Sequence, residues 1–187
     1  MVSVLLFHHA GGLTPGVESF AERLRGEGHT VHAPDLFDGR TFPDVNDGVA
    51  YARSIGEETL AAKVAEIAAE LPGIEVYGGM SMGAARAAEQ VLTRPGAKGA
   101  FFLYGAVAPS WWDATWPAGL PAQAHVTEAD PWREPEAEDE FVADVADGEL
   151  FVYPGAGHLF AEPGHPDYDE QVAKLATERI IAFLARL

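Results

Sequence analysis

The sequence of 187 residues contains no cysteine. Without a thiol the chain can form no disulfide, supply no thiolate ligand for zinc or an iron–sulfur cluster, and offer no cysteine nucleophile. Any covalent catalysis by this chain must therefore use another side chain.

Basic residues are also scarce. The sequence has 12 Lys and Arg against 29 Asp and Glu, which gives a formal net charge of −17 at pH 7. A surface this acidic repels the phosphates of nucleic acids and of anionic lipids, so we expect neither as a partner. The acidic excess is typical of a soluble protein surface, and by itself it identifies no substrate.

Long apolar segments are missing as well. Residues 99–112 carry no charge, but they include Gly, Pro and Ser and fall short of the ~20 residues needed to span a bilayer. The amino-terminal sequence MVSVLLFH has neither the basic start nor the small-residue cleavage site of a signal peptide. These features predict a soluble cytoplasmic protein with no membrane partner.

The chain instead alternates short apolar runs with segments of helical periodicity. Because the runs are apolar throughout rather than at every second residue, they predict strands covered on both faces, as in a parallel sheet. With right-handed crossovers, the pattern predicts one α/β domain over residues 1–187, with about six parallel strands in the spatial order 2-1-3-4-5-6 and helices on both faces. The predicted strands are residues 2–7, 30–33, 74–77, 99–104, 124–127 and 150–153, and the predicted helices lie within residues 17–27, 60–71, 81–92 and 168–184.

Two segments interrupt this alternation. Residues 106–121 are rich in Trp and Pro and show no helical period. This segment either lines a substrate pocket, through Trp111 and Trp112, or forms a cap, or packs at the edge of the sheet. Residues 131–147 are strongly acidic and predict the solvated face of a helix. We expect residues 39–46 to form another wall of the pocket.

The strongest chemical signal is the sequence Gly-Met-Ser-Met-Gly at residues 79–83, which matches G-x-S-x-G. It follows a predicted strand and precedes a predicted helix, and that context is the one a nucleophile elbow requires. A side chain at either flanking glycine would collide with neighbouring backbone, while the helix N-terminus favours negative charge that develops at the serine. The motif therefore predicts Ser81 as a nucleophile.

A serine nucleophile needs a base, and the base needs an acid to orient it. In hydrolases with this elbow the order along the chain is Ser, acid, His. His158 follows the last predicted strand in a loop of small residues, so we prefer it as the base over His165. The acid should follow the preceding strand, where Asp130 precedes a proline that fixes an extended loop. We prefer Asp130 as the acid over Glu128.

The first predicted strand ends in the sequence His-His-Ala-Gly-Gly at residues 8–12. Acyl transfer needs two N–H donors for the oxyanion of the tetrahedral intermediate. The backbone N–H of Met82 supplies one, and Ala10 in the Gly-rich turn is the best candidate for the other. Adjacent side chains on a strand face opposite ways, so we expect no metal site shared by His8 and His9. We expect His9 to pack near the substrate pocket.

With these motifs, the sequence resembles the dienelactone hydrolase family of α/β-hydrolases. The resemblance runs over nearly the whole chain and is carried by residues 7–16, 33–39, 79–83, 128–131 and 153–160, of which the last segment, YPGAGHLF, is the most specific. It implies a single α/β-hydrolase domain, with Ser81 as nucleophile, Asp130 as acid and His158 as base.

The chain also departs from the family pattern. The family's namesakes use a cysteine nucleophile where this chain has Ser81, and they carry a glutamate that holds the resting thiol at the position of His9. The two departures are consistent with each other, because a serine nucleophile needs no glutamate to hold a resting thiol. The departures favour a general esterase over a true dienelactone hydrolase.

Three functions remain open from the sequence. The preferred one is a serine hydrolase that cleaves carboxylic esters or lactones of small molecules through an acyl-enzyme, as a monomer or homodimer, with no metal or organic cofactor implied. The second is a non-catalytic ligand-binding or scaffold protein, against which a complete Ser, Asp and His set argues. The third is an acyltransferase with the same triad, in which another alcohol instead of water takes the acyl group.

Overall fold

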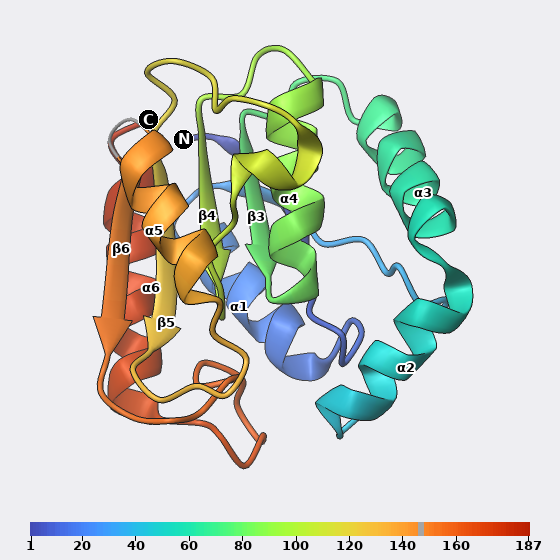
Figure 1. Cartoon of the computed structure of the whole chain (residues 1–187), viewed down its shortest axis with the longest axis vertical. Helices are drawn as coiled ribbons and strands as arrows, with labels where there is room; N and C mark the ends of the chain where they lie inside the picture. Colours follow the sequence, from blue (N-terminus) through green and yellow to red (C-terminus); the bar gives the residue numbers. More distant parts are fainter. Residues whose placement is uncertain (146–147) are drawn as a thin grey trace.

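One sheet of six parallel strands forms the centre of the computed structural model, which describes residues 1–145 and 148–187 (Figure 1). Its strands lie in the order β2-β1-β3-β4-β5-β6, which confirms the predicted topology. The strands are β1 (Ser3–Phe7), β2 (Thr30–His32), β3 (Val76–Met80), β4 (Gly99–Leu103), β5 (Ala122–Thr127) and β6 (Gly148–Tyr153).

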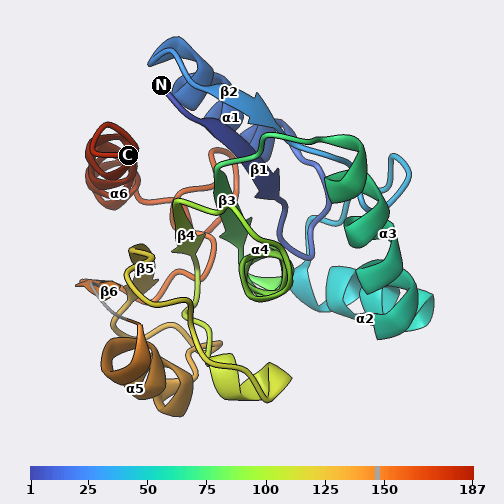
Figure 2. The ribbon, with the colours of Figure 1, turned by 90° about the horizontal axis from the view of Figure 1, so that it is seen from above.

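Helices cover both faces of this sheet (Figure 2). Helices α1 and α6 pack on one face, and helices α3, α4 and α5 pack on the other. The helices are α1 (Pro15–Gly26), α2 (Val45–Ile55), α3 (Glu57–Glu70), α4 (Met82–Thr93), α5 (Pro135–Asp144) and α6 (Glu170–Leu184). Within the described residues, no helix is both long enough and apolar enough to cross a membrane.

The apolar runs of the sequence are explained by burial on both faces of the sheet. In β1, Val4 and Leu6 pack into the core under α1 and α6, while Leu5 and Phe7 pack into the core under α3 and α4. All four side chains are fully buried. A strand covered on both faces has no solvated positions, so its sequence shows no alternation of apolar and polar residues.

Strand β3 extends further than its sequence predicts. The expected strand ended at residue 77, whereas the observed strand runs on through Gly78 and Gly79 to Met80. A Cβ at Gly78 would lie 2.3 Å from the ring of Phe101 on the neighbouring strand, so glycine is needed there for packing. Glycine weakens the sequence signal of a strand because it offers no side chain to pack, and the prediction stopped where the glycines begin.

Helix α2 was not predicted. Asp44 caps it by accepting a hydrogen bond from the N–H of Asn46 at 2.8 Å. Its only fully buried residue is Gly48, where a Cβ would lie 2.0 Å from the carbonyl oxygen of Ala10. The helix therefore packs backbone to backbone against the loop after β1 at this point. Its partly buried Tyr51, Ala52 and Ile55 also pack against the core on the α4 face, an apolar pattern that the prediction missed.

The Trp-rich segment contains one short 3-10 helix, η1 (Pro109–Trp112). Beyond it, Trp116 is buried in the core and donates its indole N–H to the carbonyl of Leu120 at 2.8 Å. The part of this segment around Trp116 thus packs on the sheet, which was one of the three alternatives for the segment.

The acidic segment forms helix α5, whose outer face is solvated as expected. Glu138 departs from the expectation, since it is buried and forms a salt bridge with Arg133. Asp147, the last acidic residue of the segment, lies outside the described residues.

Two turns at the amino-terminal edge of the sheet are open. Gly28 precedes β2 with a φ of +89°, and Gly73 precedes β3 with a φ of +104°, and at neither position would a Cβ meet another atom within 4 Å. Glycine is needed there for its backbone angle and not for space.

Candidate active site

The nucleophile elbow joins β3 to α4. Ser81 adopts a φ of 51° and a ψ of −114°, a strained conformation for a residue with a side chain. A Cβ at Gly79 would lie 2.2 Å from the carbonyl oxygen of Gly83, and one at Gly83 would lie 2.2 Å from that of Phe7. The two flanking glycines therefore allow the close backbone approach that holds Ser81 in its strained turn, as the motif predicts.

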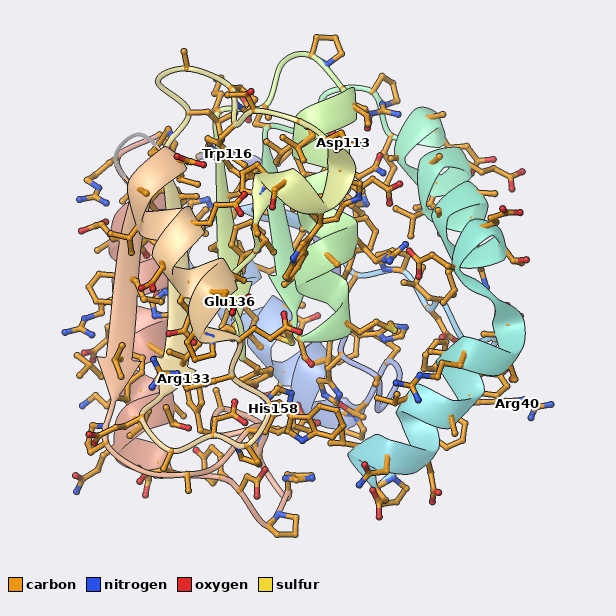
Figure 3. The ribbon with its side chains drawn as sticks, in the orientation of Figure 1. Arg40, Asp113, Trp116, Arg133, Glu136 and His158 are labelled. Carbon is orange, nitrogen blue, oxygen red and sulfur yellow. The ribbon has the colours of Figure 1, made fainter. Side chains whose placement is uncertain are left out.

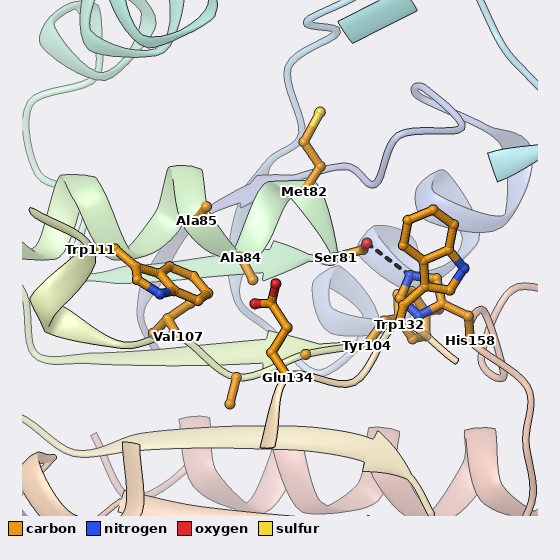
Figure 4. Close-up of a pocket in the computed structure, with 12 residues that line it drawn as sticks. Ser81, Met82, Ala84, Ala85, Tyr104, Val107, Trp111, Trp132, Glu134 and His158 are labelled. Atoms are coloured by element: carbon orange, nitrogen blue, oxygen red, sulfur yellow. Dashed lines mark hydrogen bonds between the residues drawn. The ribbon is translucent and has the colours of Figure 1, made fainter. Parts of the chain in front are cut away.

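Three side chains meet at the carboxyl-terminal edge of the sheet, where Figure 3 places His158. Nε2 of His158 lies 2.8 Å from Oγ of Ser81, the contact drawn in Figure 4. Nδ1 of His158 lies 2.7 Å from Oδ2 of Asp130. Asp130 and His158 are buried, with 6% and 4% of their surfaces exposed. The structure thus brings Ser81, His158 and Asp130 together in hydrogen-bonding order.

The two alternative residues lie elsewhere. His165 contacts Asp167, with 3.6 Å between its Nδ1 and the carboxylate. Glu128 is exposed, and its backbone carbonyl accepts a hydrogen bond from Arg133. Neither of them contacts the imidazole of His158 within hydrogen-bonding distance, in the part of the chain that the structure describes.

The loop that carries His158 is held at two points. Oδ2 of Asp167 accepts hydrogen bonds from the backbone N–H groups of His158 and Leu159. Thr127, at the end of β5, donates its hydroxyl to the carbonyl of Gly157 at 2.9 Å. Asp167 lies nine residues beyond the histidine, and the sequence analysis missed it because no local motif marks a carboxylate that binds backbone amides.

The acid has a second contact. Oδ1 of Asp130 accepts a hydrogen bond from the backbone N–H of Trp132 at 2.8 Å, while Oδ2 contacts His158. The loop after β5 therefore folds around its own carboxylate, which fixes that carboxylate against the imidazole. The ring of Trp132 lies 5.8 Å from the ring of His158.

The two expected oxyanion donors come from the turn after β1 and from the start of α4. Ala10 is buried in the turn after β1, where Gly12 donates its N–H to the carbonyl of His9. Met82 is the first residue of α4, where backbone N–H groups have no partner within the helix. Ala10 and Met82 line one cavity of about 320 Å³, and neither N–H donates a hydrogen bond to any residue that the structure describes.

A larger cavity of about 390 Å³ opens next to Ser81 and His158. Trp111 lines it, as expected, but Trp112 does not, because its side chain packs against the apolar core on the α4 face of the sheet. The sequence analysis missed Tyr104, Trp132 and Glu134, which also line it (Figure 4). These residues come from the ends of β4 and β5, and only the path of the following loops brings them to the serine.

His9 also lies outside this cavity and lines a separate one of about 270 Å³. Its Nδ1 accepts a hydrogen bond from the N–H of Gly11, and its Nε2 lies 3.4 Å from the carboxylate of Glu162. His9 was expected to pack near the substrate pocket, but it does not line the cavity beside Ser81, since its ring is turned toward the loop after β6. The carboxylate of Glu162 also accepts a hydrogen bond from the hydroxyl of Thr14.

His8 points the other way, as expected for adjacent residues. Its Nε2 accepts a hydrogen bond from the N–H of Leu36 at 3.0 Å, and its Nδ1 lies 2.7 Å from the carbonyl oxygen of His9. Burial lowers the pKa of His8 to about 4, so the ring is neutral at pH 7. Among the described residues, no three His, Asp or Glu side chains are placed to hold a metal ion.

The match of the whole chain to one protein family agrees with this arrangement. The family model described as the dienelactone hydrolase family matches residues 1–187. The chain belongs to the dienelactone hydrolase family. Dienelactone hydrolases are α/β-hydrolases, and the family and the fold together assign the chain to the hydrolases. None of the curated proteins matches the chain in sequence.

Solved structures show the same fold at low sequence identity. A proposed dienelactone hydrolase from Klebsiella pneumoniae subsp. pneumoniae is 18% identical, with a TM-score of 0.78 over 99% of this chain and 87% of that one. The dienelactone hydrolase-like promiscuous phosphotriesterase P91 from metagenomic libraries is 20% identical, with a TM-score of 0.74 over 100% and 87% of the two chains. Dienelactone hydrolase from Anabaena variabilis is 22% identical, with a TM-score of 0.66 over 97% and 86%.

Proposed function

We propose that this dienelactone hydrolase family member is a serine hydrolase that cleaves carboxylic esters or lactones of small molecules. The observation that carries the proposal is the chain of two contacts at the elbow, 2.8 Å from Ser81 to His158 and 2.7 Å from His158 to Asp130. A serine hydroxyl is a weak nucleophile on its own, and an adjacent imidazole oriented by a carboxylate is what activates it.

The first half of the reaction forms an acyl-enzyme. Oγ of Ser81 attacks the carbonyl carbon while its proton passes to Nε2 of His158, and the carbonyl oxygen becomes an oxyanion. The N–H groups of Ala10 and Met82 stabilise that oxyanion. As the intermediate collapses, the ester C–O bond breaks and the leaving alkoxide takes the proton from His158. In a lactone this alkoxide stays attached to the acyl group.

The second half returns the free enzyme. A water molecule gives a proton to Nε2 of His158 and attacks the acyl carbonyl, and the Oγ of Ser81 leaves with that proton. Asp130 accepts the hydrogen bond of Nδ1–H in both halves, which holds the imidazole in the required tautomer and stabilises its charged form. Burial of Asp130 and His158 strengthens this electrostatic interaction, because the surroundings are less polar than water.

The proposal is tested with a panel of p-nitrophenyl esters and lactones of graded chain length. We expect the wild type to hydrolyse at least the short members, and Ser81→Ala to lose this activity. Ser54→Ala is the matched control, since Ser54 lies on the exposed side of α2 and binds only its own helix. A Ser81→Ala protein as active as the wild type would contradict covalent catalysis.

A trapping experiment separates the proposal from its two alternatives. Mass spectrometry of the wild type after rapid quenching should show an acyl group on the peptide that contains Ser81. Products are then analysed with and without an added alcohol. Free acid as the main product supports a hydrolase, a new ester as the main product would indicate an acyltransferase, and a chain that never becomes acylated would indicate a binding protein.

A further inference from the structure

The cavity beside Ser81 has aromatic walls and a single carboxylate. Trp111 from η1 and Trp132 from the loop after β5 both line it, and so does Glu134. In Figure 4 the carboxylate of Glu134 points into the cavity, between the indole of Trp111 and the Ser81–His158 pair. The remaining lining is largely apolar, with alanines of α4 and Val107.

The carboxylate of Glu134 is not used by the fold. Glu134 stands at the N-cap of α5 but makes no side-chain capping bond. It forms no salt bridge with any residue that the structure describes. Its neighbour Arg133 is turned away, because the guanidinium of Arg133 binds the buried carboxylate of Glu138 and the carbonyl of Glu128. The charge of Glu134 is therefore available to a ligand in the cavity.

No basic side chain balances this charge inside the cavity. Among the described residues, its lining includes no Lys and no Arg. A substrate with a carboxylate or phosphate near the serine would meet the charge of Glu134 without compensation. A substrate with a cation would gain from that charge and from the faces of the two indoles, which attract cations within about 6 Å of the ring centre.

The backbone segments that carry the two tryptophans are held by contacts outside the cavity, while Trp111 and Trp132 themselves are 48% and 42% exposed. The N–H and hydroxyl of Ser110 donate hydrogen bonds of 2.7 and 2.6 Å to the carboxylate of Glu140 on α5, which fixes the turn that carries Trp111. The backbone N–H of Trp132 donates a hydrogen bond to the carboxylate of Asp130 at 2.8 Å, which fixes the loop that carries this tryptophan. Each tryptophan thus stands on a backbone segment that is tied to α5 or to Asp130.

From this arrangement we infer that the substrate is an ester or lactone that carries an alkylammonium group. The inference rests on the proposed ester hydrolysis at Ser81 and assigns the substrate class of that site. The ammonium group lies between Trp111 and Trp132 and against the carboxylate of Glu134. Its methyl or methylene groups contact the apolar lining, which includes Ala84 and Val107.

Two pairs of esters matched in shape test the inference. Each pair exchanges a trimethylammonium group for a tert-butyl group, once in the alcohol part (acetylcholine and its carbon isostere) and once in the acyl part of a p-nitrophenyl ester. We expect the wild type to prefer the charged member of at least one pair by about tenfold in kcat/KM, which corresponds to ~1.4 kcal/mol. The preference should shrink in about 0.5 M NaCl, because salt screens partly exposed charges.

Matched variants assign the preference to the named residues. Glu134→Gln removes the charge with little change of shape and should abolish most of the preference. Asp139→Asn, which removes one charge from an exposed position of α5 outside the cavity lining, should leave it intact. Trp111→Leu should weaken the preference, and Trp111→Phe should retain part of it, because the phenyl ring still offers an aromatic face.

The outcomes for the inference and for the proposed function are separate. Equal rates within both pairs, or an unchanged preference in Glu134→Gln, would overturn the inference, while Ser81-dependent hydrolysis of the tert-butyl esters would still support the esterase. If the protein hydrolyses no ester, the proposed function fails, and titration with choline decides the subsite. Quenching of Trp fluorescence by choline in the wild type but not in Glu134→Gln would support the ammonium subsite. Absence of quenching in the wild type would overturn the subsite.

Discussion

Oδ2 of Asp167 accepts a hydrogen bond from the backbone N–H of His158 at 3.0 Å. The same oxygen binds the next N–H along the chain, so one carboxylate fixes the backbone of the candidate base. We expect Asp167→Ala to lower kcat by about 10- to 100-fold with little change in KM, because a catalytic group displaced by about 1 Å loses much of its effect. Asp167→Asn keeps an acceptor and should lose less. Steady-state kinetics with p-nitrophenyl acetate checks this, and equal losses in both variants would refute the positioning role.

The triad residues should show much larger effects. We expect Ser81→Ala and His158→Ala to lower kcat by about 10⁴- to 10⁶-fold, with circular dichroism unchanged. Asp130→Asn should lower kcat by a similar or smaller factor, because an amide at that position stabilises the wrong imidazole tautomer. Single-turnover measurements separate loss of acylation from loss of binding. A double variant of Ser81 and His158 much less active than either single one would argue that the two do not act as a unit.

His9 should contribute far less than a triad residue. Its ring binds the N–H of Gly11 and faces Glu162 in a separate cavity. We therefore expect His9→Gln to form an acyl-enzyme and to lose less than about 100-fold in kcat/KM. Ser81→Cys should not gain strong dienelactone hydrolase activity, because position 9 carries no carboxylate to hold the resting thiol. If His9→Gln were folded and as inactive as Ser81→Ala, His9 would have to act in the proton transfer or on the oxyanion.

The loop that carries Ala10 should be sensitive to a single methyl group. A Cβ at Gly48 would lie 2.0 Å from the carbonyl oxygen of Ala10, so Gly48→Ala must displace either α2 or this loop. We expect kcat to fall by about 10- to 100-fold, because the Ala10 N–H moves away from the oxyanion. Gly26→Ala is the control, since a Cβ there meets nothing within 4 Å and the activity should not change. Equal activity of the two variants would indicate that Ala10 is not an oxyanion donor.

Stability should decrease in mild acid because of two buried histidines. Burial lowers the pKa of His8 to about 4 and that of His125 to about 3, from the ordinary histidine value of 6.5. Between about pH 6.5 and 4 the unfolded chain therefore binds more protons than the folded one, and the free energy of unfolding falls as the pH drops, by up to ~1.4 kcal/mol per pH unit for each histidine. Urea unfolding at several pH values measures this slope.

A variant of His125 tests the origin of that slope. The ring of His125 stacks between Phe151 and Tyr153, so Phe is the replacement closest in shape. His125→Phe should unfold with a shallower dependence on pH, by about one proton, whatever its stability at pH 7. An unchanged slope would show that His125 does not take up a proton on unfolding.

The order of the sheet and the proximity of Ser81, Asp130 and His158 could be predicted because their signals are local. The inner strands are buried on both faces and therefore read as apolar runs. Ser81, Asp130 and His158 follow the ends of β3, β5 and β6 by one, three and five residues. The order of parallel strands then brings these loop positions to one edge of the sheet. A contact between residues 77 positions apart follows from topology alone.

The rest of the site depends on contacts that leave no local pattern. Asp167 binds backbone amides, which any sequence could present, and α2 contacts the loop after β1 through a glycine, which reads as a turn. Trp132 and Glu134 reach the cavity because the loop after β5 turns around the carboxylate of Asp130. Trp112 was misplaced for a related reason, since two adjacent tryptophans on one short helical turn face different surroundings.

Two turns at the amino-terminal edge of the sheet give the protein a place that tolerates insertion away from its candidate active site. At the carboxyl-terminal edge, Gly48, Gly79 and Gly83 are wedged between backbone atoms, so lengthening those connections would dislodge the serine or Ala10. At the opposite edge, Gly28 and Gly73 have free space around them. We expect an inserted tag, a fused domain or a surface tether at either of these turns to leave kcat unchanged. These turns are therefore attachment points at the opposite edge of the sheet from the candidate active site.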